Sequence, residues 1–330
     1  MEDRKKDHID LAFQSQTDSL WIDNRFFYEP LLSAHPQGTP KGISIAGKKL
    51  SVPLWVSSMT GGTELAGTIN RRLARVSREF GMGMGLGSCR IILDDNKHFP
   101  DFDIRNELGP DLPLFANLGI AQLEKLAENK EFGKIDALLL KLRADGLIVH
   151  VNPIQEWLQP EGDKILRKPI DTISELLNQA GYPVIVKEVG QGMGRESLRA
   201  LLQLPLEAIE FAAFGGTNFA KLEMLRSDPE RSRIFDPISK IGHSAEEMLT
   251  MVNTIVSESE VKCKTLIISG GIKDFLDGYY LIKKSKLPAI YGQASGFLKY
   301  AKEDYEQLRK YVENQIKGLE LAYAFLTLKE

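Results

Sequence analysis

The chain has few of the features that mark several large classes of protein. It contains only two cysteines among 330 residues, Cys89 and Cys263, and their spacing is not that of a metal site, which favours a reducing, cytoplasmic compartment. The net charge is only −3, so no basic excess predicts nucleic-acid binding. No apolar run approaches the roughly 20 residues that span a membrane. The charged start MEDRKKDHIDLAF is not expected to be a signal peptide.

What the chain does contain is a regular alternation of apolar runs and amphipathic stretches. The apolar runs predict eight strands, at 51–59, 81–90, 112–120, 147–149, 183–190, 208–218, 265–272 and 289–297. Helices are predicted at 63–80, 121–141, 171–180, 195–203, 244–258, 274–285 and 301–326. About eight strand–helix units without a linker predict one α/β domain over residues 1–330, a (β/α)8 TIM barrel rather than a doubly wound sheet.

Residues 1–48 show neither a strand period nor a helix period, so we expect an N-terminal arm. The cluster Arg4-Lys5-Lys6 with His8 has two interpretations. It is a solvated terminus, or it belongs to an arm that closes over a polyanionic substrate, where basic side chains contribute charge and hydrogen-bond donors.

The stretch GLIVHVNPIQEWLQPEGD (146–163) holds the densest group of polar residues after any predicted strand. An apolar run leads into His150, Asn152, Gln155 and Glu156, and Pro153 is predicted to end the regular structure. A buried barrel strand that ends in such residues delivers side chains to a site at the C-terminal mouth. A polar loop with satisfied hydrogen bonds is the alternative.

Small and polar residues also follow other predicted strands. The glycine-rich ends at 215–217, 269–271 and 292–295 are typical of a phosphate site built from backbone N–H groups. Lys187 lies in an apolar run, so it needs a ligand or an ion pair with Glu188 or another barrel carboxylate. Further hydroxyl, amide and backbone groups come from Met59, Thr60, Ser88 and Asn117. Together these groups suit a polar heteroaromatic ring that carries a phosphate, and flavin mononucleotide (FMN) fits both halves.

Eight motifs then occur along most of the chain in the order of one family: RKKDHI (4–9), SSMTGG (57–62), GSCR (87–90), ANLG (116–119), HVNPIQEWLQPEGD (150–163), VKEVGQG (186–192), GGTN (215–218) and SGGI (269–272). Together they resemble type 2 isopentenyl-diphosphate delta-isomerase. The motif at 150–163 is highly specific, and the one at 4–9 supports it. The other motifs are shared more loosely with FMN-dependent barrel enzymes.

The resemblance implies an FMN-dependent (β/α)8 barrel that isomerises isopentenyl diphosphate to dimethylallyl diphosphate in isoprenoid biosynthesis. It implies reduced FMN, Mg2+ and NADPH as the usual reductant, with no net redox change, and flavin N5 as the favoured acid and base. It also implies a small diphosphate substrate and a cytoplasmic homo-oligomer, a tetramer or octamer. Neither nucleic acid nor a membrane is an expected partner.

The resemblance also implies roles for single residues. Residues that would bind the substrate are Arg4, Lys5, His8, Arg90, His150, Asn152 and Gln155, and Glu156 would hold Mg2+. Gln155 cannot ionise, so it is interpreted as a positioning residue. Residues that would contact FMN are Ser58, Met59, Thr60, Ser88, Asn117, Lys187, Thr217, Gly270, Gly271, Ala294 and Ser295.

Several positions depart from the family. Cys89 stands where the family usually has Gln, Gly194 where Ser is common, and Glu210 and Ala212 where an acid and a hydroxyl are usual. These departures concern FMN phosphate binding more than the reaction. The main alternative is an FMN-dependent 2-hydroxy acid oxidase or dehydrogenase with His150 as base, which leaves the 155–163 run unexplained. A binding module without turnover would not need Arg4, Lys5 and Glu156.

Overall fold

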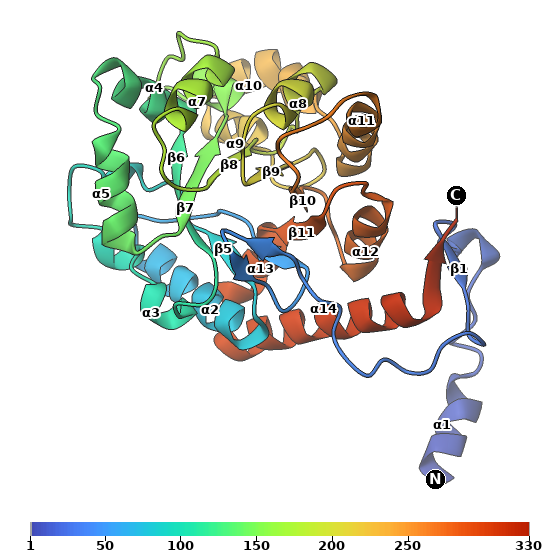
Figure 1. The fold of residues 1–330 in the computed structure, drawn as a ribbon. Coiled ribbons are helices and arrows are strands. Elements are labelled where there is room, and N and C mark those ends of the chain that lie inside the picture. The colour runs from blue at the N-terminus through green and yellow to red at the C-terminus, as the bar shows by residue number, and fades with distance from the viewer. Residues whose placement is uncertain (1, 330) are drawn as a thin grey trace.

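A computed structural model describes residues 2–329, and in this part of the chain eight parallel strands form a closed barrel (Figure 1). The strands are β4 (Leu54–Val56), β5 (Gly83–Gly85), β6 (Leu114–Gly119), β7 (Gly146–His150), β8 (Val184–Lys187), β9 (Ala208–Glu210), β10 (Leu266–Ser269) and β11 (Ala289–Gln293). Each strand pairs with its neighbour in the sequence, and β11 pairs with β4 to close the ring. The predicted (β/α)8 barrel is therefore confirmed, and every strand overlaps its predicted run.

Helices cover the outside of the barrel (Figure 1). The longer ones are α2 (Glu64–Phe80), α4 (Ile120–Glu128), α5 (Gly133–Leu142), α7 (Pro169–Leu177), α8 (Arg195–Leu202), α11 (Ala245–Glu258), α12 (Phe275–Lys284) and α14 (Tyr305–Phe325). The helix predicted at 121–141 is in fact two, α4 and α5. The chain leaves the helical path between them, where Lys130 takes a positive φ of 56°.

Shorter helices lie between these elements. They are α3 (Arg105–Leu108), α6 (Pro153–Leu158), α9 (Phe219–Arg226), α10 (Pro229–Phe235) and α13 (Ser295–Ala301), with 3-10 turns at Ser19–Trp21, Arg90–Ile92, Phe99–Asp101 and Asp236–Lys240. The prediction that Pro153 ends regular structure is wrong. Pro153 opens α6, because the first helical turn needs no N–H there and the fixed φ of proline suits it.

Apolar side chains fill the half of the barrel that lies toward the N-terminal ends of the strands. They are Trp55, Phe115, Ile148, Ile185, Ala208, Ile267 and Ile290, all fully buried. Ile45 of β2 (Ser44–Ile45) and Leu50 pack against this layer, so the hairpin formed by β2 and β3 (Lys48–Lys49) plugs one end of the barrel. Within residues 2–329 the interior of the barrel is therefore open at the other end, the C-terminal mouth of the strands.

The N-terminal arm is tied to the C-terminus rather than to the barrel mouth. Strand β1 (Phe26–Tyr28) pairs antiparallel with β12 (Leu326–Leu328), which continues from α14. Helix α1 (Glu2–Leu11) projects beyond this ribbon, away from the barrel (Figure 1). The sequence did not predict α1. Among residues 2–329 no helix combines the length and apolar character needed to cross a membrane.

Candidate active site

A polar layer lies directly above the apolar layer inside the barrel. Side chains alternate between the two faces of a strand, so the second residue after each inward apolar position also points inward. Those positions are Ser57, Gly85, Asn117, His150, Lys187, Glu210, Ser269 and Gly292. The interior thus changes from hydrocarbon to hydrogen-bonding groups and glycines within one pleat, at the C-terminal ends of the strands.

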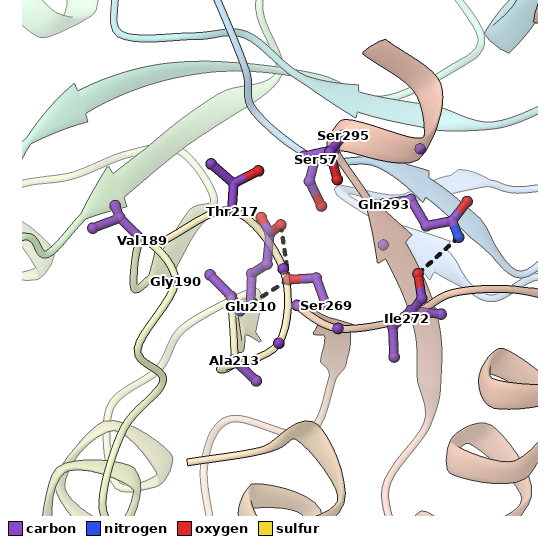
Figure 2. Close-up of a pocket in the computed structure, with 18 of the residues that line it drawn as sticks. Ser57, Val189, Gly190, Glu210, Ala213, Thr217, Ser269, Ile272, Gln293 and Ser295 are labelled. Atoms are coloured by element: carbon purple, nitrogen blue, oxygen red, sulfur yellow. Dashed lines mark hydrogen bonds between the residues drawn. The ribbon is translucent and has the colours of Figure 1, made fainter. Parts of the chain in front are cut away.

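The first of two cavities at this mouth is lined mainly by β9, β10, β11 and the turns that follow them (Figure 2). Its volume is about 380 Å³. Gly270 and Gly271 line it with positive φ angles of 88° and 74°. A Cβ on Gly270 would lie 2.1 Å from the backbone N and O of Ala213, so only glycine allows this close approach of two turns.

Several buried polar atoms in this cavity have no hydrogen-bond partner within residues 2–329. They are the Oγ atoms of Ser57 and Ser58 and Oε2 of Glu210. A buried polar group left without a partner costs about 1–3 kcal/mol. Three such atoms around one cavity therefore indicate a polar ligand, and the neighbouring glycine turns offer space and backbone donors for an anionic group.

The second cavity adjoins the first and has a volume of about 240 Å³. Ser58, Lys187, Val189 and Phe219 line both cavities. The second is otherwise lined by Met59, Gly87, Ser88, Arg90, Asn117, Gln122, His150, Asn152, Gln155, Glu156 and Gln159. Because these residues line both cavities, a ligand in one cavity would lie next to a ligand in the other.

His150 is held as a neutral imidazole at the boundary of the second cavity. Asn117 Nδ2 donates to the Leu86 carbonyl at 3.1 Å, which fixes the amide so that Asn117 Oδ1 faces His150 Nδ1 at 2.7 Å. The Nδ1–H of His150 is thus the donor, and Nε2 is left as an acceptor. Burial, assisted by the positive charge of Lys187, lowers the pKa of His150 to about 3.

Lys187 brings a positive charge to both cavities. Its Nζ donates to the Glu188 backbone carbonyl at 2.7 Å. The Glu188 carboxylate instead accepts from the backbone N–H groups of Gly190, Gln191 and Gly192. The interpretation of Lys187 as an ion-pair partner of Glu188 is therefore wrong, and within the described chain no carboxylate pairs with it. A buried cation without a counter-charge favours an electron-rich or anionic ligand.

Glu156 and Arg90 are joined through Asp163. Glu156 Oε1 accepts from Asn152 Nδ2 at 3.0 Å, and Oε2 accepts from the Asp163 backbone N–H at 2.7 Å. The Asp163 carboxylate pairs with Arg90 at 3.1 Å and with Lys125 at 2.6 Å. Across residues 2–329 no three His, Cys, Asp or Glu side chains gather around a metal position. A cation at Glu156 would therefore take most of its ligands from elsewhere.

The structure brings most of the sequence-predicted residues to the mouth. The first cavity is lined by Ser58, Lys187, Thr217, Gly270, Gly271, Ala294 and Ser295. The second is lined by Ser58, Met59, Ser88, Arg90, Asn117, His150, Asn152, Gln155, Glu156 and Lys187. Thr60 lies beside this wall, where its backbone packs closely against Gly87. Arg4, Lys5 and His8 are exposed on α1 and line neither cavity.

Other residues of the site were missed. Ser57 and Ser269 line the first cavity, and the alternation of inward positions along their strands would have found them. Glu210, which the sequence analysis connected with the FMN phosphate, lines the same cavity. Glu223 on α9 accepts from Gln155 Nε2 at 3.1 Å, and no sequence signal indicated this contact. Cys89 is fully buried, and burial raises the pKa of its thiol to about 12.

Named relatives match nearly the whole chain. No family model matches it. An isopentenyl-diphosphate delta-isomerase of Rickettsia felis (strain ATCC VR-1525 / URRWXCal2) is 32% identical over 336 residues, which cover 99% of this chain and 94% of the relative. A protein of the same name from Nostoc sp. (strain PCC 7120 / SAG 25.82 / UTEX 2576) is 36% identical over 322 residues, covering 94% and 88%.

Solved structures with the same fold are more distant in sequence. A mutant flavocytochrome b2 with benzoylformate bound superposes with a TM-score of 0.62 at 14% identity, covering 98% of this chain and 85% of that one. A mandelate oxidase mutant with a monooxide FMN adduct gives 0.55 at 13% identity, covering 93% and 88%. At these identities the likeness supports the barrel fold alone.

Proposed function

The chain belongs to the isopentenyl-diphosphate delta-isomerase family, and we propose that it converts isopentenyl diphosphate to dimethylallyl diphosphate at the C-terminal mouth of its barrel. The observation that carries this proposal is the near full-length identity to proteins of that name. The adjoining polar cavities support it, because they offer room for a cofactor beside a substrate.

We propose FMN as the occupant of the first cavity. The glycine turns at Gly270 and Gly271 suit its phosphate, and the unpartnered hydroxyls of Ser57 and Ser58 suit its polar groups. Lys187 would offer its charge to the ring. Reduced FMN would supply the acid and base that the reaction needs. We propose NADPH as the reductant on the family resemblance alone.

The second cavity would bind the substrate. Moving a double bond requires a proton added at one carbon and removed from another, and an alkene is a weak base. The chain must therefore hold the reacting carbons close to the proton donor and away from water. Gln155 is fixed for positioning, since Asn152 Nδ2 donates to its Oε1 at 3.1 Å and its Nε2 donates to Glu223.

Glu156 would hold Mg2+ and Arg90 would contact the diphosphate. Mg2+ typically takes one or two carboxylates and completes its shell with phosphate oxygens and water, which suits a single protein carboxylate beside a diphosphate. Glu156 would have to exchange a hydrogen bond from Asn152 or Asp163 for the metal. His150 and Asn152 would line the same ligand. The family resemblance assigns Arg4, Lys5 and His8 to it as well, but in this structure they lie on α1, away from the mouth.

We also propose a cytoplasmic homo-oligomer in which the arm packs on a neighbouring copy. Many large apolar side chains in the arm are exposed. Those more than half exposed are Ile9, Leu11, Phe13, Leu20, Trp21, Ile22, Phe27, Tyr28, Leu31 and Leu32. A monomer rarely exposes so many large apolar side chains in one segment. Replacing both Leu20 and Trp21 with serine should lower the mass measured by light scattering toward that of one chain. An unchanged mass would contradict this interface.

An anaerobic assay tests the function. The protein is incubated with FMN, NADPH, Mg2+ and isopentenyl diphosphate, and dimethylallyl diphosphate is detected by NMR. Product is expected. The same protein is given a 2-hydroxy acid as a control substrate, and no oxidation is expected, because His150 Nδ1 is bound to an amide rather than to a carboxylate that would stabilise a charged imidazole. Oxidation of the hydroxy acid without isomerisation would overturn the proposal.

A further inference from the structure

Glu210 is the most deeply buried acid at the barrel mouth, and it is only half satisfied. Its side chain lies inside the barrel at 0% exposure and lines the first cavity (Figure 2). Ser269 Oγ lies 3.2 Å from Oε1, and the same Oγ accepts from the Ala212 backbone N–H at 2.9 Å. The hydroxyl hydrogen of Ser269 is therefore directed at Glu210. The second oxygen, Oε2, has no partner among the described residues.

The other buried glutamates behave differently. Glu124 accepts from two backbone N–H groups, one at each oxygen. Glu156 is satisfied at both oxygens by Asn152 and Asp163. Glu223 is satisfied by Gln155 and Arg226. An acid that serves structure alone is expected to be satisfied in this way, because an unpaired buried charge is expensive. The free oxygen of Glu210 therefore indicates a ligand rather than a structural role.

The surroundings of Glu210 restrict the chemistry of that ligand. On one side its register partner is Lys187 of β8, and on the other side Ser269 leads directly into the glycine turn at 270–271. An ionised carboxylate only accepts hydrogen bonds, so it does not suit a phosphate. It suits hydroxyl groups on a chain between a ring near Lys187 and a phosphate near the glycines.

We propose that Glu210 Oε2 accepts a hydrogen bond from a hydroxyl of the polyol chain of bound FMN. This inference rests on the proposed function. It makes Glu210 a specificity residue, which distinguishes a flavin phosphate with a hydroxylated linker from one with a plain alkyl linker. Ser269 is its positioning residue, because it fixes the carboxylate through Oε1.

The test compares two ligands on the flavin-free protein. One is FMN, and the other is a flavin phosphate whose five-carbon linker has no hydroxyl groups. Dissociation constants are measured by quenching of flavin fluorescence. A hydrogen bond to a charged group is worth about 1.5–3 kcal/mol, so Glu210→Ala should weaken FMN binding on the order of 10- to 100-fold. The same change should leave the affinity for the alkyl analogue unchanged or raise it. In the unaltered protein the Glu210 carboxylate must give up water when the alkyl linker binds, and the variant has no carboxylate there.

Further variants separate this role from a general loss of structure. Glu210→Gln keeps the volume and should lose part of the FMN affinity, as should Ser269→Ala. Glu124→Gln changes a buried acid that lines neither cavity and should leave FMN affinity unchanged. If Glu210→Ala and Glu210→Gln lost equal affinity for FMN and for the alkyl analogue, this inference would be overturned but the proposed function would not. Failure of the unaltered protein to bind either flavin would overturn the proposed function and this inference with it.

Discussion

The state of His150 offers the sharpest prediction, because its pKa differs strongly between the folded and unfolded chain. The ordinary value is 6.5, and burial with the nearby Lys187 charge lowers the pKa to about 3 in the folded protein. Between these values the unfolded chain binds the proton and the folded chain does not. Stability should therefore fall as the pH is lowered from about 6.5 toward 3.

The size of this effect follows from the same two values. Each tenfold change in proton affinity is worth about 1.4 kcal/mol, so acidification from pH 7 to pH 4 should cost at most roughly 3 kcal/mol through His150. The imidazole is only partly buried at the cavity, so water screening lowers this figure. His150→Gln removes the titrating group and should flatten the pH dependence by that amount.

Two measurements test the prediction. Nitrogen NMR of the flavin-free protein should show a neutral imidazole with the proton on Nδ1 at pH 5, with the signal assigned from its loss in His150→Gln. Urea unfolding at pH 7, 5.5 and 4 should show a steeper loss of stability for the unaltered protein than for the variant. Adding inorganic diphosphate should raise the pKa of His150, because an anion favours the charged ring. An imidazolium signal at pH 6 without any anion, or equal pH slopes for both proteins, would refute the reasoning.

Two further predictions concern the metal and the phosphate. Glu156→Gln should lower activity on the order of 100-fold or more and abolish its dependence on Mg2+, because the proposed metal ligand loses its charge. Glu161→Gln, at an exposed neighbouring position, is the matched control. A Mg2+ response kept by the Glu156 variant would contradict the assignment. Gly270→Ala should lose at least about tenfold in FMN affinity, because its Cβ would meet the Ala213 backbone at 2.1 Å. Gly47→Ala has a similar φ of 72° with nothing within 4 Å, so it should cost about 1 kcal/mol of stability and leave FMN binding unchanged.

The barrel was predictable because its signal repeats along the chain. Each strand is a short apolar run, and eight runs separated by helical stretches leave few alternatives. The polar mouth was predictable where a motif ends a strand, as with His150 and Lys187. It was missed at Ser57 and Ser269, because the alternation of inward positions was not followed to the end of each run.

Other features depend on contacts that no local pattern records. Helix α6 forms although Pro153 suggests a break, because proline in the first helical turn loses no hydrogen bond. The contact of Glu223 with Gln155 joins residues 68 positions apart. Helix α1 has no apolar face turned to the barrel, so no amphipathic period marks it.

The central claim is an isomerisation that uses reduced FMN without net redox change. The most direct measurement is the number of dimethylallyl diphosphate molecules formed for each NADPH consumed under anaerobic conditions. The account predicts many product molecules per NADPH, and none when the flavin is kept oxidised. One NADPH consumed for each product, or undiminished product with oxidised flavin, would contradict it.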